Sequence, residues 1–178
     1  MKIRPTAAAV ALAGGLALLG TPGCERPAAE QSAAAAGPAA DPAADSLACA
    51  AALTAHLRAV SSRDLAGLAA TLSPRGDMQL TLQARPISRS VDTFLAFHEG
   101  WFADTSAWTW DGRILDLEAG CRLCVSTVEA TYREPDRDGV PYFNRMAVGY
   151  TLRREDGGAW RVVRDQAVSL ERSTDAQN

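Results

Sequence analysis

Residues 143–170 have the sequence FNRMAVGYTLRREDGGAWRVVRDQAVSL, which predicts two long strands joined by a tight turn. The connecting Asp156-Gly157-Gly158 suits a three-residue hairpin loop, because glycine adopts a positive φ at little cost. Counting outward from this loop gives the expected cross-strand pairs, which are Leu152 with Val162, Tyr150 with Arg164 and Val148 with Gln166. In this register the mainly apolar faces of the two strands coincide, and we expect that face to be buried.

Two polar side chains lie in the middle of this apolar face, namely Arg164 and Gln166. An apolar surface with a few polar groups set into it is typical of a ligand pocket. We expect Arg164 to bind a carboxylate or another anion, with hydrogen bonds from Gln166 and Tyr150. The alternative is structural: Arg164 pairs with a carboxylate of the protein itself, or points outward if the faces are inverted.

Composition and charge argue against a nucleic-acid partner. The chain has 178 residues, of which 47% are hydrophobic and 6% aromatic, and its net charge is −3. The basic residues form no stripe, so we expect no nucleic-acid binding. Roughly the last 130 residues have a globular pattern, which fits one domain with a single core.

The N-terminus is typical of an exported protein. Lys2 and Arg4 precede an apolar run over residues 6–19, which is too short to span a membrane and suits a signal peptide. The following Gly23-Cys24 resembles a bacterial lipoprotein signal, in which a small residue precedes a cysteine that becomes lipid-modified. The resemblance implies a signal peptide over residues 1–23 and a diacylglycerol anchor on Cys24 that attaches the exported protein to the bacterial cell envelope. The alternative is an ordinary secretory signal with an incidental cysteine.

Residues 24–45 consist almost entirely of alanine, proline, glycine and small polar residues, and they have no periodic apolar face. Such a composition predicts a flexible tether. We therefore expect the folded domain to occupy residues 46–170, followed by a polar tail over residues 171–178.

Helical patterns dominate the first half of this domain. Asp45 or Ser46 is expected to cap a helix whose apolar positions are Leu47, Ala50, Leu53, Leu57 and Val60. Asp64 is expected to cap a second, short helix. Ser90 is expected to cap a third, whose apolar stripe is Val91, Phe94, Leu95, His98, Trp101 and Phe102.

Strand patterns dominate the second half. Residues 77–83 alternate as a half-buried strand before the third helix, and Arg85-Pro86 is expected to form a loop. Residues 108–118 and 122–133 predict two further strands ahead of the hairpin with which the domain ends. The turn over residues 134–140 includes Arg137 and Asp138, which we expect to be solvated. This order predicts an α+β domain with helices on one face of an antiparallel sheet.

The same order resembles the nuclear transport factor 2-like superfamily, which includes SnoaL-like and ketosteroid isomerase-like proteins. The residues that carry the resemblance are Asp64 with Leu65 and Leu68, the helix around Phe94 and Trp101, and the ending over residues 157–166. It implies a cone-shaped fold with three N-terminal helices packed on a curved antiparallel sheet around a cavity, often in a dimer. Members include isomerases, cyclases, dehydratases and hydrolases, and others are non-catalytic binding or assembly domains.

Further candidate site residues are His98, Trp101 and Tyr132. His98 on an apolar stripe is either a core residue bonded to a backbone carbonyl, or a ligand contact or general base. Trp101 belongs to the core or forms a wall of the pocket. Tyr132 could donate a hydrogen bond to a ligand. Alternation places one candidate base, Asp165, on the outer face.

The cysteines predict a disulfide and no metal site. Cys121 and Cys124 form a lone CxxC, and no second pair or histidine spacing completes a set of four ligands. We expect no metal and no cofactor. In an exported protein a structural disulfide is the likelier use, and we favour a pair between Cys49 and one of the two strand cysteines.

Three functions remain open from the sequence. The first is a membrane-tethered domain that binds a small ligand without catalysis, which we favour because no acid and base fall on one face. The second is an enzyme of the isomerase, cyclase, dehydratase or hydrolase kind that uses the same cavity. The third is a homodimeric assembly module of the envelope. A carboxylate or histidine with a shifted pKa inside the cavity would favour the enzyme.

Overall fold

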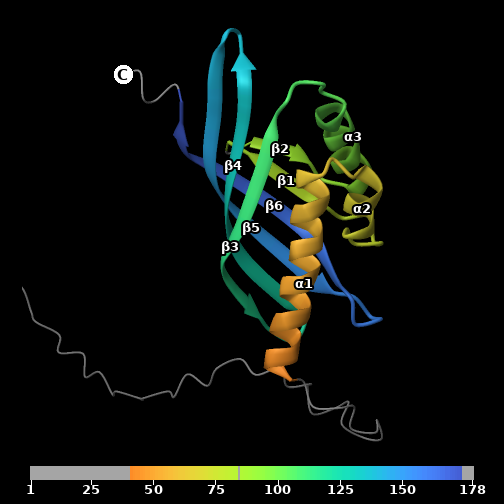
Figure 1. Cartoon of the computed structure of the whole chain (residues 1–178). Helices are drawn as coiled ribbons and strands as arrows, with labels where there is room; N and C mark the ends of the chain where they lie inside the picture. Colours follow the sequence, from red (N-terminus) through yellow and green to blue (C-terminus); the bar gives the residue numbers. More distant parts are fainter. Residues whose placement is uncertain (1–40, 84, 174–178) are drawn as a thin grey trace, which may run out of the picture. The chain divides into compact units, whose positions relative to one another are not determined.

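The structure is a computed structural model that describes residues 41–83 and 85–173 (Figure 1). The expected signal peptide, Cys24 and most of the expected tether lie outside these residues. So does most of the expected polar tail.

Helix α1, Pro42–Ser61, begins earlier than predicted. The carboxylate of Asp41 accepts hydrogen bonds from two backbone N–H groups of the first turn, and proline suits the first helical position because no intrahelical partner is lost there. The prediction that Asp45 or Ser46 caps this helix is therefore wrong. Asp45 is instead buried in the first turn, where its Oδ1 lies 2.8 Å from Nη1 of Arg154.

The buried face of α1 includes Leu53, Leu57 and Val60, as predicted, but differs at its start. Leu47, expected inside, is 74% exposed. The buried positions include two polar residues and a cysteine; they are Asp45, Cys49, Leu53, His56, Leu57, Ala59 and Val60.

The other two helices of the described chain begin where the sequence predicted. The Asp64 side chain caps α2, Leu65–Ala70, by accepting from the Gly67 N–H. Ser90 caps α3, Val91–Phe102, through a reciprocal capping box with Thr93. No helix in residues 41–83 or 85–173 is both long enough and apolar enough to cross a membrane.

Six strands of the described chain form one curved sheet in the order β2-β1-β6-β5-β4-β3 (Figure 1). Their bounds are β1 Gln79–Leu82, β2 Arg85–Ser88, β3 Thr109–Ala119, β4 Leu123–Arg137, β5 Val140–Arg154 and β6 Trp160–Arg172. The Arg85-Pro86 loop prediction is wrong, because these residues begin an edge strand. The wholly antiparallel sheet is also wrong, because β1 pairs with β6 in parallel.

The β4–β5 hairpin is longer than predicted. Its turn is reduced to Asp138-Gly139, and both residues have a positive φ, which suits a two-residue hairpin turn. Residues 134–137, which the sequence assigned to the turn, instead extend β4.

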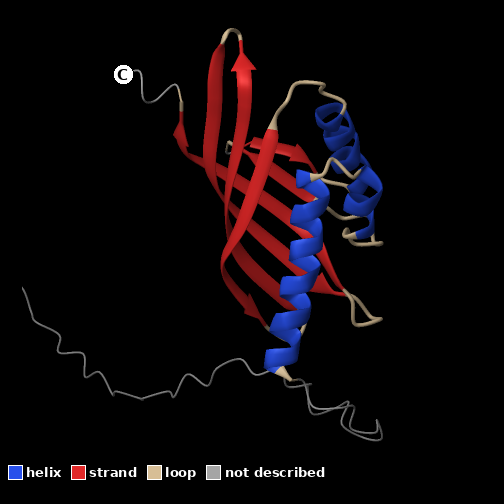
Figure 2. Ribbon diagram, in the orientation of Figure 1, coloured by secondary structure: helices blue, strands red, loops and turns tan. Residues whose placement is uncertain are grey.

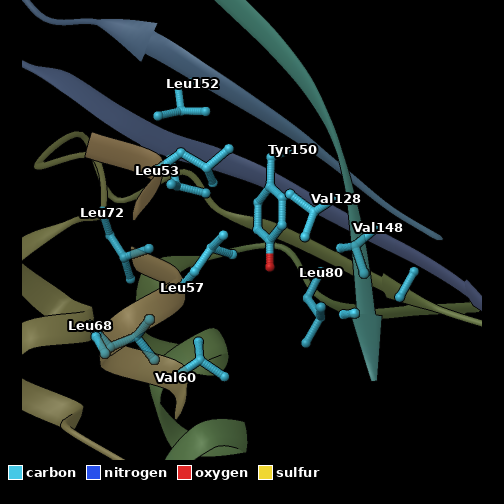
Figure 3. Packing of buried hydrophobic residues seen from close by; sticks show 14 of the residues in the cluster. Leu53, Leu57, Val60, Leu68, Leu72, Leu80, Val128, Val148, Tyr150 and Leu152 are labelled. Atoms are coloured by element: carbon cyan, nitrogen blue, oxygen red, sulfur yellow. The ribbon is translucent and has the colours of Figure 1, made fainter. Parts of the chain in front are cut away.

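The three helices of the described residues lie on one face of the sheet (Figure 2), which confirms the α+β class. The core between the two layers is built from leucines of α1 and apolar residues of the sheet (Figure 3). Helix α3 comes after β1 and β2 in the chain, so the helices are not all N-terminal.

The register of the closing hairpin changes within β6. Leu152 pairs with Val162 as predicted, but Thr151 then pairs with Arg164, so Val163 is an extra residue without a partner on β5. Such a β-bulge reverses the inward and outward alternation of the residues that follow, here as far as a second bulge at Leu170. Tyr150 therefore lies opposite Asp165, not Arg164.

A disulfide joins the helical layer to the sheet. Cys49 of α1 bonds Cys124 of β4, which confirms the predicted pairing of Cys49 with a strand cysteine. The two residues are separated by 75 positions in the sequence, so the bond closes a long loop.

Replacing both cysteines (Cys49→Ala with Cys124→Ala) should lower the free energy of unfolding by about 2–5 kcal/mol, because the unfolded chain regains the freedom that the loop removes. Chemical denaturation of the domain, followed by circular dichroism, measures the change. A loss below about 1 kcal/mol would show that this bond contributes little to the stability of the two-layer fold.

Candidate functional site

A cavity of about 360 Å³ lies between the sheet and the helices. Its lining is mostly apolar and aromatic, with polar groups from α3, β4, β5 and β6. The lining residues are Val60, Leu80, Leu82, Phe97, His98, Trp101, Trp110, Tyr132, Arg137, Asn144, Met146, Val148, Tyr150, Asp165 and Ala167.

Arg164 and Gln166 do not line this cavity. Both are exposed on the outer face of the sheet, so the predicted inward orientation of this pair is wrong. The physical reason is the bulge at Val163, which turns Asp165 and Ala167 inward in their place.

Asp165 is the buried carboxyl group of the cavity. Asp165 is only 8% exposed, and its Oδ1 has no hydrogen-bond partner among the described residues. Burial raises the pKa of Asp165 from the usual 3.8 to about 7, because an apolar environment disfavours the charged form; the neighbouring Tyr150 hydroxyl opposes this shift. Near neutral pH the group can therefore hold or release a proton.

Tyr150, which the sequence placed in the pocket, does line the cavity. Figure 3 shows its hydroxyl group reaching from β5 to a position between Leu57 and Leu80. Burial, followed by the negative charge of Asp165, raises the pKa of Tyr150 well above its usual value. The phenol therefore remains protonated and can donate a hydrogen bond.

His98 also lines the cavity, and its bond to a backbone carbonyl fixes its tautomer. Nδ1 lies 2.9 Å from the Phe94 carbonyl oxygen, which can only accept, so Nδ1 carries the proton. Nε2 then holds the lone pair. Burial lowers the pKa of His98 to about 4, so the ring is neutral at physiological pH.

Aromatic residues and an ion pair form another part of the wall. Trp101 stacks on Trp108 with 4.7 Å between ring centroids. The Tyr132 hydroxyl donates to Glu134, and Arg137 pairs with the same carboxylate, which it meets through Nε at 2.7 Å. The prediction that Arg137 is solvated in a turn is wrong, because the longer hairpin brings it to the cavity.

Arg63 fixes the loop that leads from α3 to β3. Its guanidinium donates to the carbonyls of Asp104, Ser106 and Trp108, each at 3.0 Å, and lies 4.0 Å from the centroid of the Trp108 ring. This clamp supports the stacked tryptophans from outside the cavity.

The sequence missed His56, which supports the site from behind the cavity wall. It is fully buried on α1, its Nδ1 lies 2.7 Å from Thr71 Oγ1, and its ring meets that of Tyr150 edge to face. Burial lowers the pKa of His56 to about 3. Its position three residues after Leu53 on the apolar face was the available signal.

The sequence pattern predicts the inward position of one unpaired polar residue of the cavity, Asn144, but not that of the other, Asp165. Asn144 lies an even number of positions from Val148 and Tyr150 on β5, so alternation alone puts it on their inner face. Alternation along β6 placed Asp165 outside, because the spacing of the apolar residues in β6 does not reveal the bulge.

No group of His, Cys, Asp and Glu in residues 41–83 or 85–173 is arranged to hold a metal.

Asp165→Asn should stabilise the protein at pH 8 and much less at pH 5. The folded-state pKa is raised, so stability is present below about 3.8 and is lost as pH rises toward 7. The amide removes that loss, and we expect a gain of about 1–3 kcal/mol at pH 8. Thermal unfolding at the two pH values measures it; an equal effect at both would contradict the buried carboxyl.

The chain resembles known proteins in structure and not in sequence. No protein family model matches the chain, and no curated protein matches it. Among solved structures, a ketosteroid isomerase-like protein from Erwinia carotovora atroseptica has a TM-score of 0.61 at 18% identity, with 71% of this chain and 97% of that chain covered. A hexachlorocyclohexane dehydrochlorinase has a TM-score of 0.62 at 16% identity, with 74% and 91% covered.

A nuclear transport factor 2-like superfamily protein from Salmonella enterica has a TM-score of 0.59 at 10% identity, with 71% of this chain and 92% of that chain covered. At such identities the likeness concerns the fold. The chain has the fold of nuclear transport factor 2-like and ketosteroid isomerase-like proteins.

Proposed function

We propose that this chain is an acid–base enzyme that transfers a proton to or from a small, mostly apolar molecule held in the cavity. The observation that carries the proposal is Asp165, a buried carboxyl group with a pKa of about 7 and an unpartnered oxygen in an apolar cavity. A general base or acid works best when its pKa lies near the working pH.

The residues around Asp165 suit the other roles of such a reaction. Tyr150 stays protonated and can donate a hydrogen bond to an oxygen that becomes negative as the proton leaves. His98 presents a neutral ring whose Nε2 can accept a second hydrogen bond. Proton removal beside a carbonyl leads to isomerisation, and removal beside a leaving group leads to elimination.

Neighbours of the same fold are named for both outcomes. One is called ketosteroid isomerase-like, and another is a dehydrochlorinase. These names belong to those proteins, and they support the reaction class without identifying the substrate of this one.

Catalysis is favoured over the non-catalytic alternative by the composition of the cavity. The sequence favoured simple binding because no acid and base fell on one face, and the bulge removes that objection by bringing Asp165 beside Tyr150. A flat, exposed apolar sheet face would favour the assembly alternative. The outer face does expose Val125 and Val168. It also carries a row of ion pairs, in which Glu129 meets Arg113 at 3.2 Å and Arg145 at 3.3 Å, so it is not wholly apolar.

A base in an apolar cavity should open the ring of 5-nitrobenzisoxazole, a small flat probe. The carboxylate takes the proton from the ring carbon, the N–O bond breaks, and a coloured cyanophenolate is released. We expect turnover to rise with pH through about 7, the pKa of Asp165, and Asp165→Asn to lower the rate about a hundredfold or more.

Gln166→Ala is the matched control, because Gln166 is the exposed neighbour of Asp165 on β6 and should leave the rate unchanged. A rate that has already reached its plateau at pH 5 would point to His98 as the base. No turnover above the buffer rate would overturn the acid–base proposal.

We also propose that the domain is exported and held at the cell envelope by a lipid on Cys24. The support is the sequence of the N-terminus, in which a short basic segment, an apolar run and Gly23-Cys24 follow in order. A lipid-anchored enzyme of this kind would meet apolar substrates close to the membrane surface.

Cys24→Ser should release the protein from the membrane fraction of an expressing bacterium. Mass spectrometry of the unaltered protein should show a diacylglycerol-modified N-terminus, and that mass should be absent from the variant. A mature protein without lipid on Cys24 would show an ordinary secretory signal instead.

A further inference from the structure

A second polar group of the cavity has no partner and lies far from Asp165 along the strand. Asn144 lines the cavity from β5, and its Oδ1 is buried without a hydrogen-bond partner among the described residues. Leaving a buried amide oxygen unpaired is costly, so such a group points to a ligand that completes it.

The neighbours of Asn144 leave its oxygen unpaired. Tyr132 lies opposite it on β4, but the Tyr132 hydroxyl is already bound to Glu134. Arg172 lies opposite it on β6, and the Arg172 guanidinium binds the Ser169 hydroxyl at 2.9 Å. The amide can present either its oxygen or its NH₂ group, so it can accept from or donate to a ligand.

Asn144 and Tyr150 lie at opposite ends of the cavity face of β5. Tyr150 lies six positions after Asn144 in an extended strand, so their Cα atoms are roughly 20 Å apart. The inward residues between them are Met146 and Val148, both apolar. The cavity therefore offers a polar group at each end of an apolar middle.

Charge excludes an anion as the natural occupant. Arg137 is the one guanidinium among the lining residues described, and Glu134 already neutralises it through two hydrogen bonds. Asp165 supplies partial negative charge at the other end, which would repel a carboxylate or phosphate. An uncharged molecule needs no free cation and is not repelled by Asp165.

We infer that the substrate of the proposed reaction is an elongated, uncharged, apolar molecule with a polar group at each end. One group meets Asp165 and Tyr150, and Asn144 binds the other. Asn144 is then the residue that selects substrates by their far end. This inference rests on the proposed function, because the end at Asp165 is taken as the reacting end.

Two probes that differ by one hydroxyl group test the far end directly. 4,4″-Dihydroxy-p-terphenyl has a polar group at both ends, and 4-hydroxy-p-terphenyl has one. Isothermal titration calorimetry should show the diol binding about tenfold more tightly, which is the effect of one well-placed hydrogen bond. Asn144→Leu, similar in size but apolar, should reduce the preference to within about twofold.

Asn144→Asp retains an acceptor of the same shape and should keep the preference, which separates lost hydrogen bonding from lost folding. Thr127→Ala, an exposed change on the outer face of β4, is the matched control. The carboxylate probe 4″-hydroxy-p-terphenyl-4-carboxylate should bind more weakly than the diol. Tighter binding of the carboxylate would overturn the uncharged substrate class.

The outcomes separate this inference from the acid–base proposal. Equal binding of diol and phenol by the unaltered protein, or no binding of either, overturns the role of Asn144 even if 5-nitrobenzisoxazole is turned over. A preference for the diol that survives Asp165→Asn and disappears in Asn144→Leu supports the role of Asn144 even if that turnover fails.

Discussion

The extra residue in β6 is the constraint on which the cavity depends. Strand β6 lies near the centre of the sheet, between β1 and β5, and its side chains alternate between core and solvent. Val163 interrupts that alternation before the cavity, so Val162 and Asp165 both face inward while Arg164 faces out. Without the bulge an arginine would enter an apolar space that offers it no carboxylate. With it, a carboxyl group enters beside a tyrosine.

The buried ionisable groups of the site have opposite effects on stability over the same pH range. His56 and His98 have lowered pKa values, so they favour the folded state above 6.5 and cost stability as pH falls below it. Asp165 has a raised pKa and favours the folded state at low pH. Near neutral pH both rings are neutral while the carboxyl group exchanges its proton, which is the state an acid–base site requires. The disulfide from Cys49 and the clamp by Arg63 supply rigidity that can offset this cost.

Sequence patterns were sufficient for most of the fold and for part of the site. The caps at Asp64 and Ser90, the disulfide partner class of Cys49 and the presence of Tyr150, His98, Trp101 and Tyr132 in or beside the cavity follow from local chemistry and periodicity. The inward position of Asp165 does not follow from them. A bulge depends on how two strands pair, and the sequence of β6 alone does not show it. The cap at Asp41 was not predicted, because the first residues of α1 are proline and alanines, the same composition as the expected tether.

The pattern of unsatisfied groups connects structure to function more closely than the fold does. A folded protein normally pairs its buried polar atoms, and this fold serves proteins with different activities. Among the described residues, the cavity keeps two oxygens unpaired, Asp165 Oδ1 and Asn144 Oδ1. Arg137 and Tyr132, which also line it, are both bound to Glu134. Because Arg137 is paired with Glu134, the cavity has little attraction for anions. The unpaired oxygens of Asp165 and Asn144 can still form hydrogen bonds at two separate points. In the function that we propose, that division selects a neutral, two-ended ligand and places the proton-transferring group at one end of it.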